Sequence, residues 1–95
     1  MSEQSSITIT NNGSAFEATK DALSVGYIKY AHHDGYIDAY STVVDPAHRG
    51  EGIASKLVEA LVAEATSTDL RVKPTCPYID AWLKKHPDID AVVRL

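Results

Sequence analysis

Between residues 7 and 44 the hydrophobic and polar positions alternate, which is typical of strands that bury one face. Four runs are predicted to be strands: residues 7–10, 15–18, 23–31 and 36–44. In the third run, Gly26 and Ile28 fall on one side of the strand and Val25 falls on the other. Asn-Gly and Asp-Gly pairs lie between the first and second runs and between the third and fourth, so we expect a meander of antiparallel strands.

The spacing of the hydrophobic residues changes after Pro46. Over residues 52–66 they recur at the spacing of one buried helix face: Ile53, Leu57, Val58, Leu61, Val62 and Ala65. A fifth strand is predicted over residues 70–73 and a second helix over residues 78–86, where Pro87 ends it. A strand–helix–strand order implies a right-handed crossover between parallel strands. The predicted fold class is α+β, an antiparallel β-meander followed by a β-α-β crossover and a second helix, while residues 89–95 are too few to assign.

The length of 95 residues suits a single domain over residues 1–95, of which residues 1–5 are expected to be disordered. An apolar content of 44% and a net charge of −4 are ordinary for a soluble protein and argue against nucleic acid as a partner. No apolar run reaches the roughly 18 residues of a membrane helix, and the polar N-terminus is not a signal peptide. A single cysteine excludes an internal disulfide, so a cytoplasmic location is expected. A monomer and a homodimer fit the sequence equally well.

Residues 49–54, Arg-Gly-Glu-Gly-Ile-Ala, follow the predicted fourth strand and lead into the first turn of the first helix. The first amides of a helix have no internal partner, and they lie at the positive end of the helix dipole. Glycine allows a ligand to approach such a backbone without meeting a Cβ, and Arg49 adds a positive charge. The pattern therefore predicts a phosphate-binding site at the start of the helix.

Two common phosphate-binding motifs fit this segment poorly. A P-loop requires Gly-x-x-x-x-Gly-Lys followed by Ser or Thr, which the sequence lacks. The dinucleotide motif Gly-x-Gly-x-x-Gly is met only in part, because Ser55 stands where the third glycine belongs. That motif also belongs to the first strand and helix of a parallel sheet. Here four predicted strands precede it, and the next strand ends at Lys73 rather than at an acidic residue.

A third motif fits in order and in residue type. Arg49-x-x-Gly52-x-Ala54 resembles the coenzyme A pyrophosphate motif, Arg/Gln-x-x-Gly-x-Gly/Ala, of the GNAT N-acetyltransferases. From about residue 15 to residue 87 the chain resembles the short, single-domain GNAT proteins of the YjdJ type. Their further motifs are Pro-x-Cys-Pro/Ser-Tyr/Phe and a helix that ends in His-Pro. The corresponding segments here are residues 74–78, Pro-Thr-Cys-Pro-Tyr, and residues 86–87.

The resemblance implies a minimal GNAT fold and an acetyl-CoA-dependent N-acetyltransferase that acts on a primary amine and uses no metal. The acceptor, a small molecule or a protein, is not indicated. The residues assigned to coenzyme A are the turn and its flanks: Val43, Val44, Arg49, Gly50, Glu51, Gly52, Ile53, Ala54, Ser55 and Lys56. Members of this group often carry His-Thr-Glu on the preceding strand, where this chain has Ser-Thr-Val at residues 41–43. A non-catalytic module that binds or senses acyl-CoA is therefore the alternative.

Cys76 and Tyr78, both in the Pro-Thr-Cys-Pro-Tyr segment, are the candidate catalytic residues. Cys76 would protonate the departing CoA thiolate or accept the acetyl group itself in a ping-pong route, and a buried thiol that only packs is the alternative. Tyr78 would donate its hydroxyl to the leaving sulfur or would only pack. His32 and His33, which are adjacent in the chain, have no cysteine or carboxylate at ligand spacing, so a zinc site is not expected.

Overall fold

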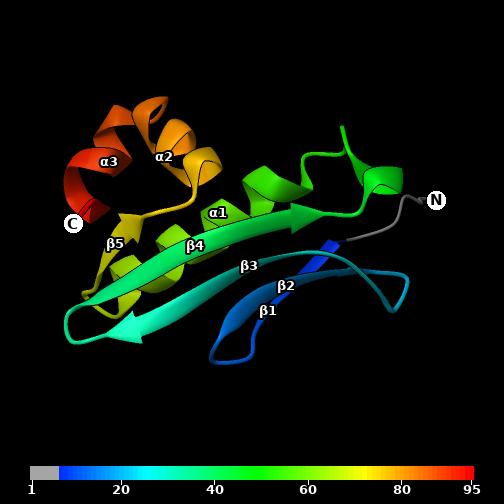
Figure 1. Ribbon diagram of the computed structural model, residues 1–95, viewed down its shortest axis with the longest axis horizontal. Coiled ribbons are helices and arrows are strands. Elements are labelled where there is room, and N and C mark those ends of the chain that lie inside the picture. Colours follow the sequence, from blue (N-terminus) through cyan, green and yellow to red (C-terminus); the bar gives the residue numbers. More distant parts are fainter. Residues whose placement is uncertain (1–6) are drawn as a thin grey trace.

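The computed structural model describes residues 7–95, so the predicted disorder of residues 1–5 lies outside the described residues. Its sheet has five strands in sequence order: β1 (Ile7–Asn11), β2 (Ala15–Lys20), β3 (Leu23–His33), β4 (Tyr36–Val44) and β5 (Arg71–Pro74). Neighbouring strands are antiparallel except β4 and β5, which are parallel (Figure 1). The predicted α+β fold, with its meander and crossover, is confirmed.

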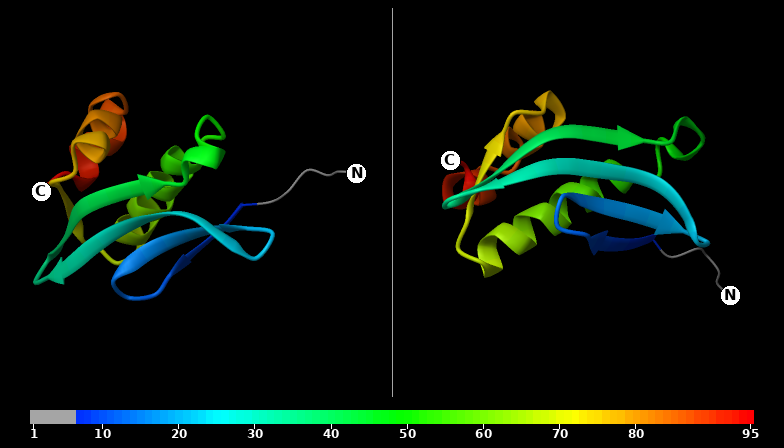
Figure 2. Two further views of the ribbon diagram at one scale, coloured as in Figure 1. Left: turned by 45° about the vertical axis from the view of Figure 1, so that its right-hand side comes forward. Right: turned by 60° about the horizontal axis from the view of Figure 1, so that its bottom comes forward.

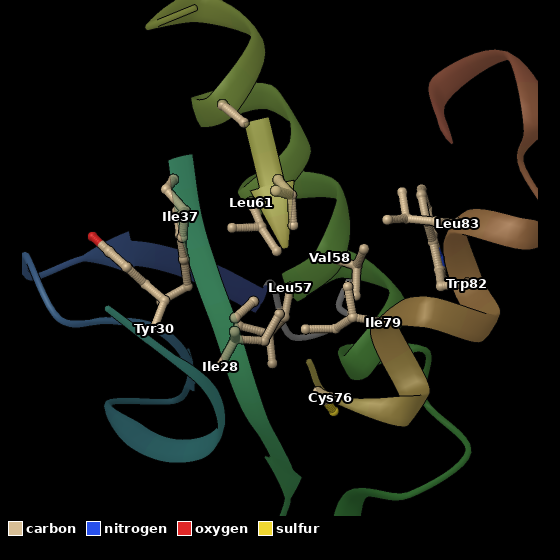
Figure 3. Close-up of a cluster of buried hydrophobic side chains, with 14 of the residues drawn as sticks. Ile28, Tyr30, Ile37, Leu57, Val58, Leu61, Cys76, Ile79, Trp82 and Leu83 are labelled. Carbon is tan, nitrogen blue, oxygen red and sulfur yellow. The ribbon is translucent and has the colours of Figure 1, made fainter. Parts of the chain in front are cut away.

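The helices of the described chain follow the meander: α1 (Ile53–Ser67), α2 (Pro77–Lys84) and α3 (Pro87–Val93). The first of these, α1, crosses the sheet and contacts all five strands, whereas α2 and α3 lie together beside β5 (Figures 1 and 2). Apolar side chains from the sheet, α1 and α2 form one buried cluster, which includes Ile28, Ile37, Leu57, Leu61, Ile79 and Leu83 (Figure 3). Each such side chain stabilises the fold by about 1.5–3 kcal/mol when it leaves water. Within residues 7–95, no helix has both the length and the apolar character needed to cross a membrane.

A β-bulge between β2 and β3 changes which side chains of β3 are buried. The register shifts between Ala18 and Thr19, and Val25 is left without a paired residue on β2. Val25 is only 1% exposed, and the adjacent Gly26 is buried as well. The predicted alternation, which sends Val25 to the opposite side of the strand, is therefore wrong at this position.

The C-terminal segment differs from the prediction in where its helices begin and end. The second helix ends at Lys84 instead of residue 86, and His86 is the N-cap of α3, which the sequence pattern left unassigned. The guanidinium of Arg94 joins the two helices, with Nη1 2.7 Å from Asp80 Oδ1 and Nε 2.6 Å from Asp90 Oδ1. These contacts stabilise α3, a short helix that the hydrophobic pattern of its own residues does not predict.

Gly26 lies where α1 begins against the sheet. A Cβ at this position would be 2.9 Å from the carbonyl oxygen of Val43 and 3.3 Å from Cγ2 of Ile53. The missing side chain therefore allows the first residue of α1 to sit directly on β3. This close contact places the turn before α1 next to the end of β4.

Gly26→Ala is expected to destabilise the fold by about 1–3 kcal/mol, because the added methyl group has no space beside the β4 backbone. Urea unfolding followed by circular dichroism measures the change. Ser24→Ala, at an exposed position of the same strand, is the control and should change the free energy of unfolding by less than about 0.5 kcal/mol. Equal unfolding midpoints for the two variants would contradict the steric argument.

Candidate functional site

The two parallel strands separate before β4 ends. Their pairing stops at Ala39 of β4, so residues 40–44 have no partner on β5. The amide of Asp45 donates to the carbonyl oxygen of Val25 on β3 at 2.8 Å. Because successive amides of a strand point to opposite sides, the N–H of Val44 faces away from β3 and into the gap beside β5.

A short 3-10 helix, η1 (Pro46–His48), and a glycine turn connect β4 to α1. Asp45 caps η1, since its Oδ1 accepts a hydrogen bond from the amide of Ala47 at 2.9 Å. Gly50 and Gly52 then adopt left-handed conformations, with φ of 87° and 76°, which residues with a Cβ rarely adopt. The strand–turn–helix arrangement expected for a phosphate-binding segment is present.

Within residues 7–95, no side chain caps the N-terminus of α1. Gly52 is the N-cap residue, and the first helical hydrogen bond runs from the Lys56 amide to the Gly52 carbonyl oxygen at 3.1 Å. The amides of residues 53–55 have no hydrogen-bond acceptor within residues 7–95, and no acidic side chain lies in the first turn. These three N–H groups, here called the anion site, lie at the positive end of the helix dipole and are free to bind an anion.

A cavity of about 430 Å³ adjoins the anion site and reaches the end of β4. Its lining residues are Thr42, Val44, His48, Arg49, Gly50, Gly52, Ile53, Ala54, Ser55 and Tyr78. All of them except Thr42 and His48 are among the site residues that the sequence predicts. The guanidinium of Arg49 is exposed and makes no ion pair within residues 7–95, so its charge is available to the cavity.

Some of the predicted site residues lie outside the cavity lining: Val43, Glu51, Lys56 and Cys76. Val43 pairs with Tyr27 of β3, and its side chain is 43% exposed. Its neighbours Thr42 and Val44 line the cavity, so alternation directs the Val43 side chain to the opposite face of the sheet. Lys56 is exposed one residue beyond the anion site.

Glu51 brings a negative charge into the glycine turn, and two basic side chains pair with it. Its Oε1 lies 3.0 Å from Lys20 Nζ on β2, and its Oε2 lies 3.3 Å from His48 Nδ1. The hydrogen bond from Lys20, followed by that from His48, lowers the pKa of the Glu51 carboxyl below its ordinary value. Glu51 therefore stays ionised, but the charge of Lys20 offsets its own. Because Glu51 also does not line the cavity, it repels a bound anion less.

Cys76 is only 7% exposed and lies at the edge of the buried cluster (Figure 3). Its thiol donates a hydrogen bond to Thr42 Oγ1 with an S···O distance of 3.3 Å. Since Thr42 lines the cavity, the thiol is one side chain away from it. Within residues 7–95, no imidazole contacts the Cys76 sulfur.

Tyr78, the second residue of α2, lines the cavity and is 41% exposed. Partial burial raises the pKa of its hydroxyl above the ordinary value for tyrosine. The phenol therefore keeps its proton at neutral pH. Nowhere in the described chain is a group of three or more His, Cys, Asp or Glu side chains arranged to hold a metal ion.

Residues 15–92, which include the glycine turn, Cys76 and Tyr78, match the sequence profile of the GCN5-related N-acetyl-transferase family. The chain belongs to this family.

This GCN5-related chain is similar to Protein NATD1 of Bos taurus, at 39% identity over 51 residues, which are 54% of this chain and 45% of the bovine protein. Protein NATD1 of Homo sapiens is 37% identical over 51 residues, again 54% of this chain and 45% of the human protein. The match thus spans about half the length of these relatives.

Among solved structures, the fold is similar to that of the aminoglycoside N-acetyltransferase AAC(6')-Iy in complex with CoA. The TM-score is 0.53, and the superposition covers 79% of this chain and 57% of that chain. At 21% sequence identity this likeness concerns the fold alone.

Proposed function

We propose that this protein is an acetyl-CoA-dependent N-acetyltransferase of the short YjdJ type, a single cytoplasmic domain that transfers an acetyl group to a primary amine. The observation that carries the proposal is the anion site beside the guanidinium of Arg49, which makes no ion pair within residues 7–95. Membership of the GCN5-related family supports acetyl-CoA as the ligand. The CoA complex of a protein with a similar fold agrees with this choice.

The anion site fits a diphosphate. Each N–H of residues 53–55 would donate to a phosphate oxygen, and a charge-assisted hydrogen bond of this kind contributes about 1.5–3 kcal/mol. Apart from the adjacent residues in the chain, no atom of residues 7–95 lies within 4 Å of a Cβ built at Gly50 or Gly52, so the backbone of the turn is open to the ligand. Arg49 and Ser55 line the same cavity and supply further donors.

The acetyl end of the co-substrate would lie toward the gap between β4 and β5. The N–H of Val44 faces this gap and would polarise the thioester carbonyl and stabilise the negative charge that develops on its oxygen. The neutral amine nitrogen attacks the carbonyl carbon, the C–S bond breaks, and the CoA sulfur takes up a proton. The proton that the amine loses passes to solvent.

We assign Tyr78 as the proton donor to the leaving sulfur, because it lines the cavity and its hydroxyl keeps its proton at neutral pH. Cys76 would assist the same step through Thr42, which lines the cavity and accepts a hydrogen bond from the thiol. A nucleophilic thiolate needs a neighbouring base or positive charge. Since no imidazole contacts Sγ in the described chain, we propose direct transfer rather than an acetyl-Cys76 route.

Cys76→Ala is expected to lower kcat by less than about tenfold, because Tyr78 still supplies the proton. Thiol release with a chromogenic disulfide measures kcat, and mass spectrometry after incubation with acetyl-CoA should find no acetyl adduct on the parent chain. Cys76→Ser, which can still donate to Thr42, is the control and should be closer to the parent. Complete loss of activity, together with an acetyl adduct on Cys76, would establish the ping-pong route instead.

Calorimetric titration of the protein with CoA tests the proposed function directly. Saturable binding is expected, and absence of binding at millimolar CoA would remove the enzyme assignment altogether. Thiol release in the presence of primary amines, including free amino acids, polyamines and lysine peptides, then tests for transfer. Tight CoA binding without turnover of any amine would favour a module that only binds CoA.

A further inference from the structure

Trp82 of α2 reaches the first turn of α1. Its indole Nε1 donates a hydrogen bond to Ser55 Oγ at 3.0 Å. Trp82 is only 7% exposed and projects from α2 at the edge of the buried cluster (Figure 3). Ser55 lines the cavity and its amide belongs to the anion site. This hydrogen bond therefore connects the interior of the protein to the wall of the proposed diphosphate site.

The direction of this hydrogen bond leaves the Ser55 hydroxyl hydrogen unused. An indole N–H can only donate, whereas a serine hydroxyl has one hydrogen and two acceptor lone pairs. Ser55 Oγ must therefore accept from Trp82, and its own hydrogen remains available. By contrast, Thr66 of the same helix donates its hydroxyl hydrogen to the carbonyl oxygen of Val62 at 2.8 Å. Ser55 has no such acceptor within residues 7–95.

The imidazole ring of His86 packs against the face of the Trp82 indole. The Trp82 and His86 rings stack with centroids 3.8 Å apart and an interplanar angle of 16°. His86 Nδ1 also donates to the carbonyl oxygen of Trp82 at 2.7 Å. These contacts keep the indole N–H directed at Ser55. A hydroxyl that is already oriented loses less rotational freedom when it binds a ligand, and this raises affinity.

We propose that Trp82 is a positioning residue for coenzyme A binding, which orients the Ser55 hydroxyl so that its hydrogen is donated to the diphosphate. The inference rests on the proposed function, because it concerns the same anion site. It gives Ser55 a second donor beside its backbone amide. It also gives Trp82, which is not part of the cavity lining, a defined part in ligand affinity.

Trp82→Phe tests this inference, because it keeps an aromatic ring against His86 and removes the N–H donor. The Kd for CoA, measured by calorimetry, is expected to rise about fivefold, and Ser55→Ala should raise it about tenfold. Adding Trp82→Phe to Ser55→Ala should cause no further change, since no hydroxyl is left to orient. A parent-like Kd for Trp82→Phe, or losses that multiply in the double variant, would overturn the proposal.

Tyr30→Phe is the matched control for loss of an aromatic donor. Tyr30 is buried, and its hydroxyl donates to Asn11 Oδ1 at 2.6 Å on the β1 side of the sheet. Neither residue lines the cavity, so the Kd for CoA should match that of the parent chain. A rise equal to that of Trp82→Phe would mean that general loosening, rather than orientation of Ser55, explains the effect.

Trp82 is the single tryptophan of the chain, so its indole N–H gives one NMR signal that needs no turnover. In the parent chain this signal should shift on addition of CoA, and in Ser55→Ala it should shift much less. A parent chain that binds CoA without any change in the indole signal would overturn the inference and leave the proposed function standing. A parent chain that binds no CoA would overturn the proposed function itself.

Discussion

Gly52→Asp is expected to raise the Kd for CoA at least about 100-fold while the chain stays folded. Asp tolerates the left-handed backbone better than most residues, and a Cβ at Gly52 would meet no atom within 4 Å. The new carboxylate would lie beside the anion site, where it neutralises the helix dipole and repels the diphosphate. Loss of two charge-assisted hydrogen bonds, at roughly 1.5–3 kcal/mol each, accounts for an effect of this size.

Gly35→Asp is the matched control for this variant. Gly35 has a φ of 86°, close to the 76° of Gly52, and its Cβ would also meet nothing within 4 Å. It lies in the turn between β3 and β4, at the end of β4 that is remote from the cavity. Gly35→Asp should lose about 1–2 kcal/mol of stability, and Gly52→Asp should lose less because its carboxylate interacts favourably with the helix dipole. Only Gly52→Asp should lose CoA binding in calorimetry. Equal losses of affinity would contradict the assignment of the anion site.

Tyr78→Phe is expected to lower kcat about 100-fold with little change in the Kd for CoA, because general acids typically contribute factors of this order. The ring still packs at the cavity wall, and only the proton donor is removed. Thiol release measures kcat, and calorimetry measures Kd. Tyr40→Phe is the control, since Tyr40 is 48% exposed on β4 and does not line the cavity.

The pH profile separates proton donation from packing. Burial raises the pKa of Tyr78 above its ordinary value of 10.0, and the protonated form is the active one. The parent chain should therefore keep its Tyr78-dependent activity through neutral pH and lose it only as the pH rises past that pKa. In Tyr78→Phe this alkaline loss should be absent. A variant with parent-like kcat and an unchanged alkaline limb would show that another group protonates the sulfur.

Local patterns were sufficient to predict most of the fold. Alternation over residues 36–44 predicted the bounds of β4 correctly, and helical spacing predicted those of α1 to within one residue. The glycine turn could be predicted because it depends on residues that are adjacent in the sequence. Gly50 and Gly52 adopt the left-handed backbone, and the amphipathic helix follows directly. The parallel β4–β5 pairing followed from the order of the elements alone.

The missed features depend on contacts between residues far apart in the chain. The burial of Val25 results from a bulge in the β2–β3 pairing, and no single-strand pattern encodes it. Thr42 lies beyond the point where β4 and β5 stop pairing, and there it accepts a hydrogen bond from the Cys76 thiol. The hydrogen bond of Trp82 to Ser55 likewise joins α2 to α1, which are separated in the sequence by β5 and its flanking loops. Such pairings become visible only when the packing is known.

The uncapped start of α1 has a consequence for how long the protein survives in a cell. The free energy of unfolding of a small domain is low. Three amides at the start of this helix hydrogen-bond to water unless an anion binds them. A ligand that binds only the folded chain adds about 1.4 kcal/mol for every tenfold excess over its Kd. If acetyl-CoA is that ligand, starvation that depletes it would also expose the chain to unfolding and proteolysis. Abundance of the protein would then follow the supply of this ligand.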